Sequence, residues 1–203
     1  MFHDRKEICS ALRTSLQLLR EEGVKIDSIT FAGNGEPTMH PDFEGVMEDV
    51  IEMRNLYSSD SEISVLSNSL LASKPSVRRA LMKADRRIMK LDAGNARMFN
   101  LLNQPNGQGQ FSKVMETLCS FNGDLEIQSF FVHGSHNNVE VDNTTLEELA
   151  SWLECIKKIH PRKVLIYSLD RPAPATGLTK VGYEDLVKIA LPLRSMGIEA
   201  AVF

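Results

Sequence analysis

Residues 29–38, with the sequence ITFAGNGEPT, constrain the fold of this chain more than any other stretch. The first four are β-branched, aromatic or small, and they predict a buried strand. Residues 33–35 (Gly-Asn-Gly) tolerate positive φ and predict a sharp turn that exposes backbone amides at the strand's carboxyl end. Glu36 follows at the mouth of that turn, and Pro37 fixes the backbone behind it. Because ligands bind at the carboxyl ends of parallel strands, this turn is the first candidate site.

The chemistry of the turn suits a zwitterionic ligand. The Glu36 carboxylate would face an ammonium group, and the free amides of the glycine turn would face an anion. The alternative is a tight strand-to-helix turn with a capping acid. A short glycine motif alone does not decide between the two interpretations.

The rest of the chain alternates strand and helix patterns, which predicts an α/β fold with a parallel sheet and right-handed crossovers. Six strands are too few for a complete eight-stranded barrel, and either a partial barrel or a doubly wound sheet fits the pattern. The length of 203 residues suits a single domain, residues 1–203. The expected strands are residues 28–32, 62–66, 87–92, 125–132, 163–169 and 198–203. The expected helices are residues 5–22, 42–57, 75–84, 93–102, 111–120 and 183–195, with one more begun by a capping box of Thr144 and Glu147.

Composition excludes some functions. The chain has 27 acidic and 23 basic residues, a net charge of −4, which argues against a broad nucleic-acid-binding surface. No apolar run approaches the ~20 residues needed to cross a bilayer. The first residues lack the apolar core of a signal peptide, so the cytoplasm is the expected location.

No metal site is predicted. Cys9, Cys119 and Cys155 are far apart and share no metal-ligand spacing, so ordinary buried or half-buried thiols are expected. His133 and His136 lie three apart in a loop rich in Gly, Ser and Asn, without a clear third ligand. Loop packing or contact with a substrate is favoured for these two histidines.

Polar residues also follow the second and third expected strands. The run Ser67, Asn68 and Ser69 can satisfy the backbone of its own turn or bind a carboxylate or ribose of a ligand. Lys90 and Asp92 share one face of a strand, because side chains alternate along it. They form either a structural ion pair or a pair that contacts substrate.

The later strands supply further candidates. Gln128 lies on a central strand, where a polar side chain would point into the cavity of a barrel. Tyr167, Asp170 and Arg171 lie at the mouth of the next strand, which the following prolines end. A local salt bridge between Asp170 and Arg171 is the alternative.

Residues 33–43, GNGEPTMHPDF, closely resemble the second-strand motif of radical S-adenosylmethionine (SAM) enzymes. In that superfamily a Gly-Gly-Glu-like turn holds the amino group of the methionine part of SAM. The resemblance follows the element order of nearly the whole chain, with weaker support at residues 67–69 and 142–145, and it implies a partial (β/α)6-type TIM-like barrel. It assigns the amino group to Gly33, Asn34, Gly35, Glu36 and Pro37, the carboxylate or ribose to Ser67, Asn68 and Ser69, and the ribose and adenine to Gln128 and Tyr167.

One departure from the family is serious. Radical SAM enzymes carry a Cys-x3-Cys-x2-Cys loop after their first strand, which binds a [4Fe–4S] cluster, whereas here only four residues precede the helix at 5–22. We therefore expect a core without its first strand, inactive alone. A complete relative would use the cluster to cleave SAM reductively to a 5′-deoxyadenosyl radical that acts on an unknown substrate. The cluster could form here only if a missing amino-terminal segment supplied the cysteines.

The departure also affects partners. Without a first strand, the edge at residues 28–32 is expected to be exposed and to invite pairing with a second copy of the chain. Two other functional classes stay open. One is a cluster-less module that binds SAM or another nucleotide-like ligand, or that serves as a scaffold. The other is an unrelated partial-barrel enzyme that uses Glu36, Lys90 and Asp92 for acid–base chemistry.

Overall fold

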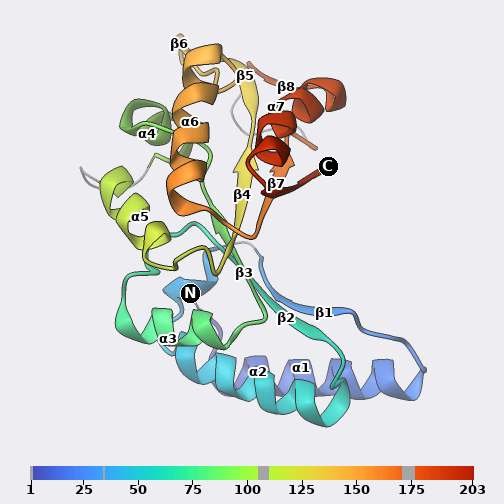
Figure 1. Cartoon of the computed structure of the whole chain (residues 1–203). Coiled ribbons are helices and arrows are strands. Elements are labelled where there is room, and N and C mark those ends of the chain that lie inside the picture. Colours follow the sequence, from blue (N-terminus) through green and yellow to red (C-terminus); the bar gives the residue numbers. More distant parts are fainter. Residues whose placement is uncertain (1, 34, 105–109, 171–176) are drawn as a thin grey trace. The chain divides into compact units, whose positions relative to one another are not determined.

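A computed structural model describes residues 2–33, 35–104, 110–170 and 177–203 of the chain (Figure 1). The chain forms two compact units, Met1–Ile88 and Met89–Phe203, and each is considered by itself. The parallel α/β fold predicted from the sequence is confirmed in both. In the described residues no helix is long and apolar enough to cross a membrane.

The first unit begins with a strongly capped helix. Asp4 accepts a hydrogen bond from the Lys6 amide at 2.8 Å, and Glu7 accepts one from the Asp4 amide at 3.2 Å, which completes a capping box. Gly23 follows the helix with a φ of +70°. The elements of this unit are α1 (Arg5–Glu21), β1 (Ser28–Phe31), the 3₁₀ helix η1 (Pro37–Met39), α2 (Phe43–Tyr57), β2 (Glu62–Ser67), α3 (Pro75–Lys83) and the first part of β3 (Arg86–Lys90).

The strand order in the first unit is β1-β2-β3, and β1 pairs with β2 in parallel, from Ser28 opposite Glu62 to Phe31 opposite Val65. Helices α1 and α2 run side by side along this part of the sheet (Figure 1). The apolar core lies between β2 and the helices, with Ile63 and Val65 fully buried. Because β1 and β2 are parallel, their carboxyl ends lie at the same end of the sheet, and the candidate glycine turn follows the carboxyl end of β1.

The prediction that the first strand is buried was wrong. None of the four residues of β1 is buried, since Ser28 and Thr30 are exposed and Ile29 and Phe31 are half-buried. The physical reason is that β1 ends the strand order, so a neighbouring strand covers one edge only. Phe31 packs edge-to-face on Phe43 of α2, with ring centroids 5.6 Å apart. Pairing of β1 with another chain stays a prediction.

The strands of the second unit follow the order β3-β4-β7-β9. Strand β4 pairs with β7 from Glu126 opposite Lys163 to Phe130 opposite Tyr167, and β7 pairs with β9, both in parallel. Its elements are α4 (Ala96–Asn103), α5 (Gln110–Cys119), β4 (Glu126–Phe130), β5 (Val132–His136), β6 (Val139–Glu140), α6 (Leu146–Ile159), β7 (Lys163–Tyr167), β8 (Leu178–Lys180), α7 (Tyr183–Ser195) and β9 (Glu199–Val202).

A small antiparallel sheet, β6-β5-β8, was not predicted. The expected strand 125–132 is in fact two strands, β4 and β5, and the expected histidine loop is most of β5. Strands β5 and β6 form a hairpin because Asn137 and Asn138 both take positive φ, +51° and +61°, as a two-residue turn requires. The sequence predicts a loop at Asn137 and Asn138, whereas the structure shows that they form the turn between two paired strands.

The predicted capping box of α6 was wrong by one residue. Thr145, not Thr144, caps the helix and accepts a hydrogen bond from the Glu148 amide at 3.3 Å. The Thr144 hydroxyl instead donates to Asp142 at 2.6 Å. Glu148 is buried and binds Arg97, with nitrogen and oxygen 2.9 Å apart, so it ties α6 to α4.

Candidate functional site

The glycine turn after β1 leads directly into η1. Gly33 has a φ of +152°, which favours glycine, as the sequence indicates. Glu36 is the N-cap of η1, and Pro37 occupies its first position. Asn34, the middle residue of the predicted turn, lies outside the described residues. The backbone therefore delivers the Glu36 side chain to the carboxyl edge of the sheet.

The Glu36 carboxylate joins the carboxyl ends of β1 and β2. Its Oε1 accepts hydrogen bonds from the Thr38 amide at 3.1 Å, from the Thr38 hydroxyl at 2.5 Å and from the Ser67 hydroxyl at 2.9 Å. Its Oε2 accepts one from the Asn68 amide at 2.6 Å. The structure thus brings Glu36 into contact with Ser67 and Asn68, two candidates that lie 31 and 32 residues further along the sequence.

Within the described residues, no positive charge of the protein neutralises this carboxylate. All four donors are neutral groups, and among the described residues no lysine, arginine or histidine forms an ion pair with Glu36. Thr38 and Ser67 are buried, with 2% and 6% of their surface exposed. A fixed carboxylate that has neutral donors and no cationic partner is suited to an external cation.

The Ser67–Ser69 run serves its own turn as well. The Ser67 hydroxyl accepts a hydrogen bond from the Ser69 amide at 3.1 Å, and Asn68 Oδ1 accepts one from the Leu70 amide at 3.0 Å. Ser69 is buried and takes a φ of +71°, which is uncommon outside glycine. Both interpretations of this run therefore apply to Ser67, which holds the turn and contacts Glu36.

A pocket of about 550 Å³ opens beside Glu36 within the first unit. Its wall is mostly apolar, and Glu36 is the one carboxylate among the described residues that line it. The backbone of the glycine turn forms one side, and helices α1 and α2 form another. The lining residues are Phe2, His3, Ile8, Phe31, Ala32, Gly33, Gly35, Glu36, Pro37, His40, Phe43 and Val46.

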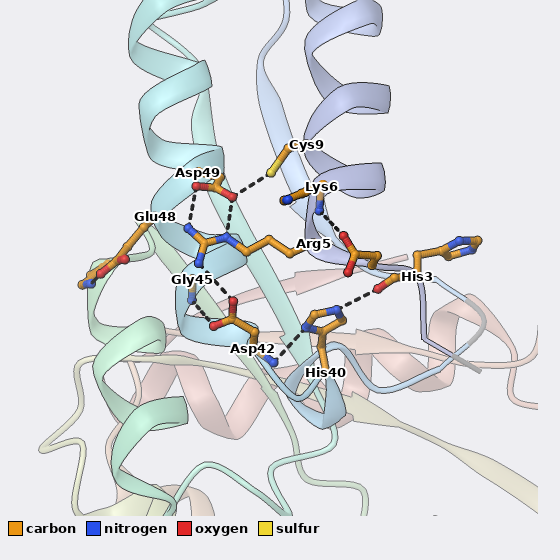
Figure 2. Close-up of polar contacts among 11 residues, drawn as sticks. His3, Arg5, Lys6, Cys9, His40, Asp42, Gly45, Glu48 and Asp49 are labelled. Carbon is orange, nitrogen blue, oxygen red and sulfur yellow. Dashed lines mark hydrogen bonds and ion pairs between the residues drawn. The ribbon is translucent and has the colours of Figure 1, made fainter.

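The amino-terminal segment is fastened to this pocket by His40. Its Nε2 donates to the His3 carbonyl at 3.0 Å, and its Nδ1 accepts from the Asp42 amide at 3.1 Å (Figure 2). These two bonds fix the tautomer, with the proton on Nε2. The Phe2 ring packs edge-to-face on the imidazole, with centroids 5.8 Å apart. These contacts hold His3 and Phe2 in place in the wall of the pocket.

Comparison of sequences finds a GTPase Obg and several UPF0026 proteins as relatives. No protein-family model matches the chain. A GTPase Obg of Brachyspira hyodysenteriae is 31% identical over 150 residues, which cover 72% of this chain and 20% of that protein. UPF0026 proteins of Helicobacter pylori and Methanocaldococcus jannaschii are 26% and 23% identical, covering 82% and 93% of this chain. The chain spans 51% and 55% of their length, so it matches about half of each.

Comparison of structures decides the fold. SuiB of Streptococcus suis bound to its precursor peptide aligns over 96% of this chain and 42% of its own, with a TM-score of 0.67 and 14% identity. SuiB bound to SAM gives 0.63 over the same shares with 13% identity. Coproporphyrinogen III oxidase of Escherichia coli, a radical SAM enzyme, gives 0.55 over 95% and 46% with 13% identity. The chain has the fold of radical SAM enzymes.

The radical SAM fold confirms the partial barrel that the resemblance of residues 33–43 implied. Identities of 13% and 14% establish the fold alone, not the reaction. The glycine turn and Glu36 occupy the carboxyl edge of β1 and β2, as expected for this fold. Binding of SAM by these residues is a proposal.

The cysteines do not fit the cluster of a radical SAM enzyme. Cys9 donates a hydrogen bond to Asp49 Oδ2 at 2.7 Å, and burial together with that carboxylate raises the pKa of its thiol to about 11 (Figure 2). Cys155 is buried, its Sγ 3.4 Å from the Gly94 carbonyl. The part of the chain that the structure describes contains no group of three or more His, Cys, Asp or Glu residues able to hold a metal.

In the second unit, Lys90 and Asp92 form an ion pair, with Nζ and Oδ2 2.9 Å apart. Asp92 lies just beyond β3, and its Oδ1 accepts a hydrogen bond from the Phe130 amide at 2.9 Å. Its side chain is fully buried, so burial raises the pKa of the carboxyl while Lys90 opposes the shift. The structural alternative is therefore present, and contact with a substrate stays a prediction.

Gln128 and Tyr167 share one face of the sheet in the second unit. Gln128 is opposite Leu165, and Phe130 is opposite Tyr167. Because every second residue of a strand points to the same face, these four side chains share one face of the sheet. The rings of Phe130 and Tyr167 are 5.4 Å apart. Burial and the Asp92 carboxylate raise the pKa of the Tyr167 phenol, which therefore stays protonated. Contact of either residue with ribose or adenine stays a prediction.

Of the remaining candidates, the structure describes His133, His136 and Asp170. His133 and His136 lie three residues apart on β5, so their side chains leave opposite faces of that strand. His136 contacts Asn137, its Nε2 3.1 Å from the side-chain amide nitrogen. Asp170 is exposed at the end of the described segment, and Arg171 lies outside the described residues.

Two residues that were not among the predicted candidates, Thr38 in η1 and Asn143 shortly before α6, make central hydrogen bonds. Thr38 makes two of the four hydrogen bonds to Glu36, although the sequence only places it after a proline. Asn143 donates to the carbonyls of Asp92 and Phe130 at 2.9 and 2.7 Å and accepts from the Val132 amide at 2.8 Å. The signals for Asn143 were its position next to a predicted cap and its place within residues 142–145, where the family resemblance has weaker support.

Proposed function

We propose that the first unit of this chain binds SAM, with the Glu36 carboxylate facing the ammonium group of the methionine part. The observation that carries the proposal is that Glu36 is fixed by four neutral donors and has no cationic partner among the described residues. A pocket of about 550 Å³ lies beside it, large enough for part of such a ligand. The radical SAM fold, which includes SuiB bound to SAM, supports the assignment.

The chain's own residues would bind and orient the ligand. The ammonium would pair with Glu36, the free amides of the glycine turn would face the carboxylate, and the apolar pocket wall would exclude water. When bound in a radical SAM enzyme, a [4Fe–4S] cluster supplies the electron that cleaves SAM. Because Cys9 and Cys155 are hydrogen-bonded within the fold, we propose reductive cleavage only for a protein whose cluster ligands lie outside the described residues.

Isothermal titration of the purified chain with SAM tests the proposal. The test variant is Glu36→Gln, which keeps the side-chain shape and removes the charge. The matched control is Glu52→Gln, at an exposed position of α2. We expect the wild type and the control to bind equally, and Glu36→Gln to bind about 10- to 100-fold more weakly, the effect of a hydrogen bond to a charged group.

Two results would overturn the proposal. One is an absence of heat with millimolar SAM, which would favour the scaffold interpretation. The other is equal affinity of the wild type and Glu36→Gln, which would show that SAM binds elsewhere. Titration with adenosine separates a further alternative. If adenosine binds as tightly as SAM, the site is a nucleotide site that does not use the amino group.

A further inference from the structure

We propose that Thr38 is a positioning residue for the ligand's amino group. In this view Thr38 saturates one oxygen of Glu36, so that the other oxygen is the one offered to the ammonium. The inference rests on the proposed function of Glu36, but it concerns a different residue and a separate measurement. It also commits to one carboxylate oxygen, Oε2, as the recognising atom.

The distribution of donors on the carboxylate is uneven. Oε1 accepts three hydrogen bonds, two from Thr38 and one from Ser67, and Oε2 accepts one, from the Asn68 amide. The two oxygens of a carboxylate offer about four lone-pair positions together, so Oε1, with three donors, is crowded and Oε2, with one donor, can accept another. An ammonium donor would therefore be received at Oε2.

The Thr38 hydroxyl is held for this contact. Thr38 is in η1 and 2% exposed, and its hydroxyl lies 2.5 Å from Glu36 Oε1. Capping of η1 needs only the bond from the Thr38 amide, which any residue would supply. The hydroxyl bond is thus additional to the cap, and it fixes the rotation of the carboxylate. Removal of the hydroxyl would let the carboxylate rotate, so that Oε2 would no longer be held toward the ligand.

A double-mutant cycle on SAM affinity tests the inference. Thr38→Val removes the hydroxyl at nearly constant shape, and Thr38→Ser keeps it. If Thr38 acts through Glu36, we expect Thr38→Val to weaken SAM binding about tenfold, the usual effect of one hydrogen bond to a charged group, and Thr38→Ser to stay within about twofold of the wild type. In a Glu36→Gln background the same Thr38→Val change should have no further effect.

Each outcome is informative. Equal losses from Thr38→Val in both backgrounds would show a purely structural role and overturn the inference, while SAM binding itself would still support the proposed function. Equal affinity of Thr38→Val and the wild type would also overturn it. If Thr38→Val does not fold, Ser67→Ala, which removes the other hydroxyl on Oε1, carries the same cycle with the same expectation. Absence of SAM binding by the wild type is the separate failure of the proposed function.

Discussion

The guanidinium of Arg5 donates two parallel hydrogen bonds to the carboxylate of Asp49, from Nε at 2.6 Å and from Nη2 at 2.7 Å (Figure 2). Its remaining nitrogen, Nη1, donates to Asp42 at 3.0 Å. The contact joins the start of α1 to α2 across 44 residues of sequence. Such two-point contacts are stronger and more specific than single ion pairs. The contact with Arg5 lowers the pKa of Asp49 from 3.8 to about 2.

This lowered pKa predicts a stability change in acid. The pKa of Asp49 is lower in the folded state, so its contribution is present above pH ~4 and is lost as the pH falls through about 2. Arg5→Met should lower the free energy of unfolding at pH 7 only modestly, because solvent screens exposed ion pairs, and it should flatten this acid loss. Urea unfolding between pH 2 and 7 measures both effects. Arg13→Met, at an exposed site on α1, is the control, and an acid loss as steep in Arg5→Met as in the wild type would contradict the prediction.

Cys9 should react slowly with thiol reagents. Burial and the hydrogen bond to Asp49 raise its pKa to about 11, against 9.0 for an ordinary thiol. At pH 8 the reactive thiolate should therefore be about 100-fold scarcer than in the unfolded chain. Alkylation by iodoacetamide is carried out in native buffer and in urea, and peptide mass analysis then gives the ratio of the two alkylation rates. Asp49→Asn should speed the native reaction, and equal native rates in wild type and Asp49→Asn would disprove the role of the carboxylate.

The periodic patterns of the sequence were sufficient for the main elements. The apolar stripe of α1 and the cap at Asp42 predicted two helices close to their observed bounds. The contact between Arg5 and Asp49 could not be predicted, because charged residues on helix surfaces pair in many ways and the pairing depends on how the helices pack. The burial of β1 was misjudged because composition describes strand propensity only, and the exposed edge at residues 28–32 was indicated by the family resemblance instead.

The candidate site, too, could be predicted from the sequence only in part. Backbone chemistry predicted the Gly33 turn and the polar end of β2, because both depend on local sequence. It did not predict that Glu36 contacts Ser67 and Asn68, since that contact requires the parallel register of β1 and β2. Asn143 was not predicted as a site residue because its three partners, Asp92 just beyond β3, Phe130 on β4 and Val132 on β5, lie elsewhere in the sequence.

Asn143 should be a main determinant of stability in the second unit. Its side chain is 2% exposed and satisfies the backbone groups of Asp92, Phe130 and Val132. Asn143→Ala would leave these buried groups without partners and should cost about 3 kcal/mol. Chemical denaturation measures the loss. Asn100→Ala, at an exposed position of α4, should change stability by less than about 0.5 kcal/mol, and similar losses in both variants would refute the assignment.

Gly94 should not tolerate a side chain. The loop after β3 runs so close to α6 that a Cβ at this position would collide with the backbone of Ser151 and Trp152. Helix backbone cannot move aside as a flexible side chain can, so Gly94→Ala should destabilise the fold by about 3 kcal/mol or more. Gly182→Ala is the matched control, because its nearest neighbouring atom would be 4.0 Å away. Thermal unfolding of both variants measures the difference, and a melting temperature of Gly94→Ala as high as that of Gly182→Ala would show that α6 can retreat from the loop.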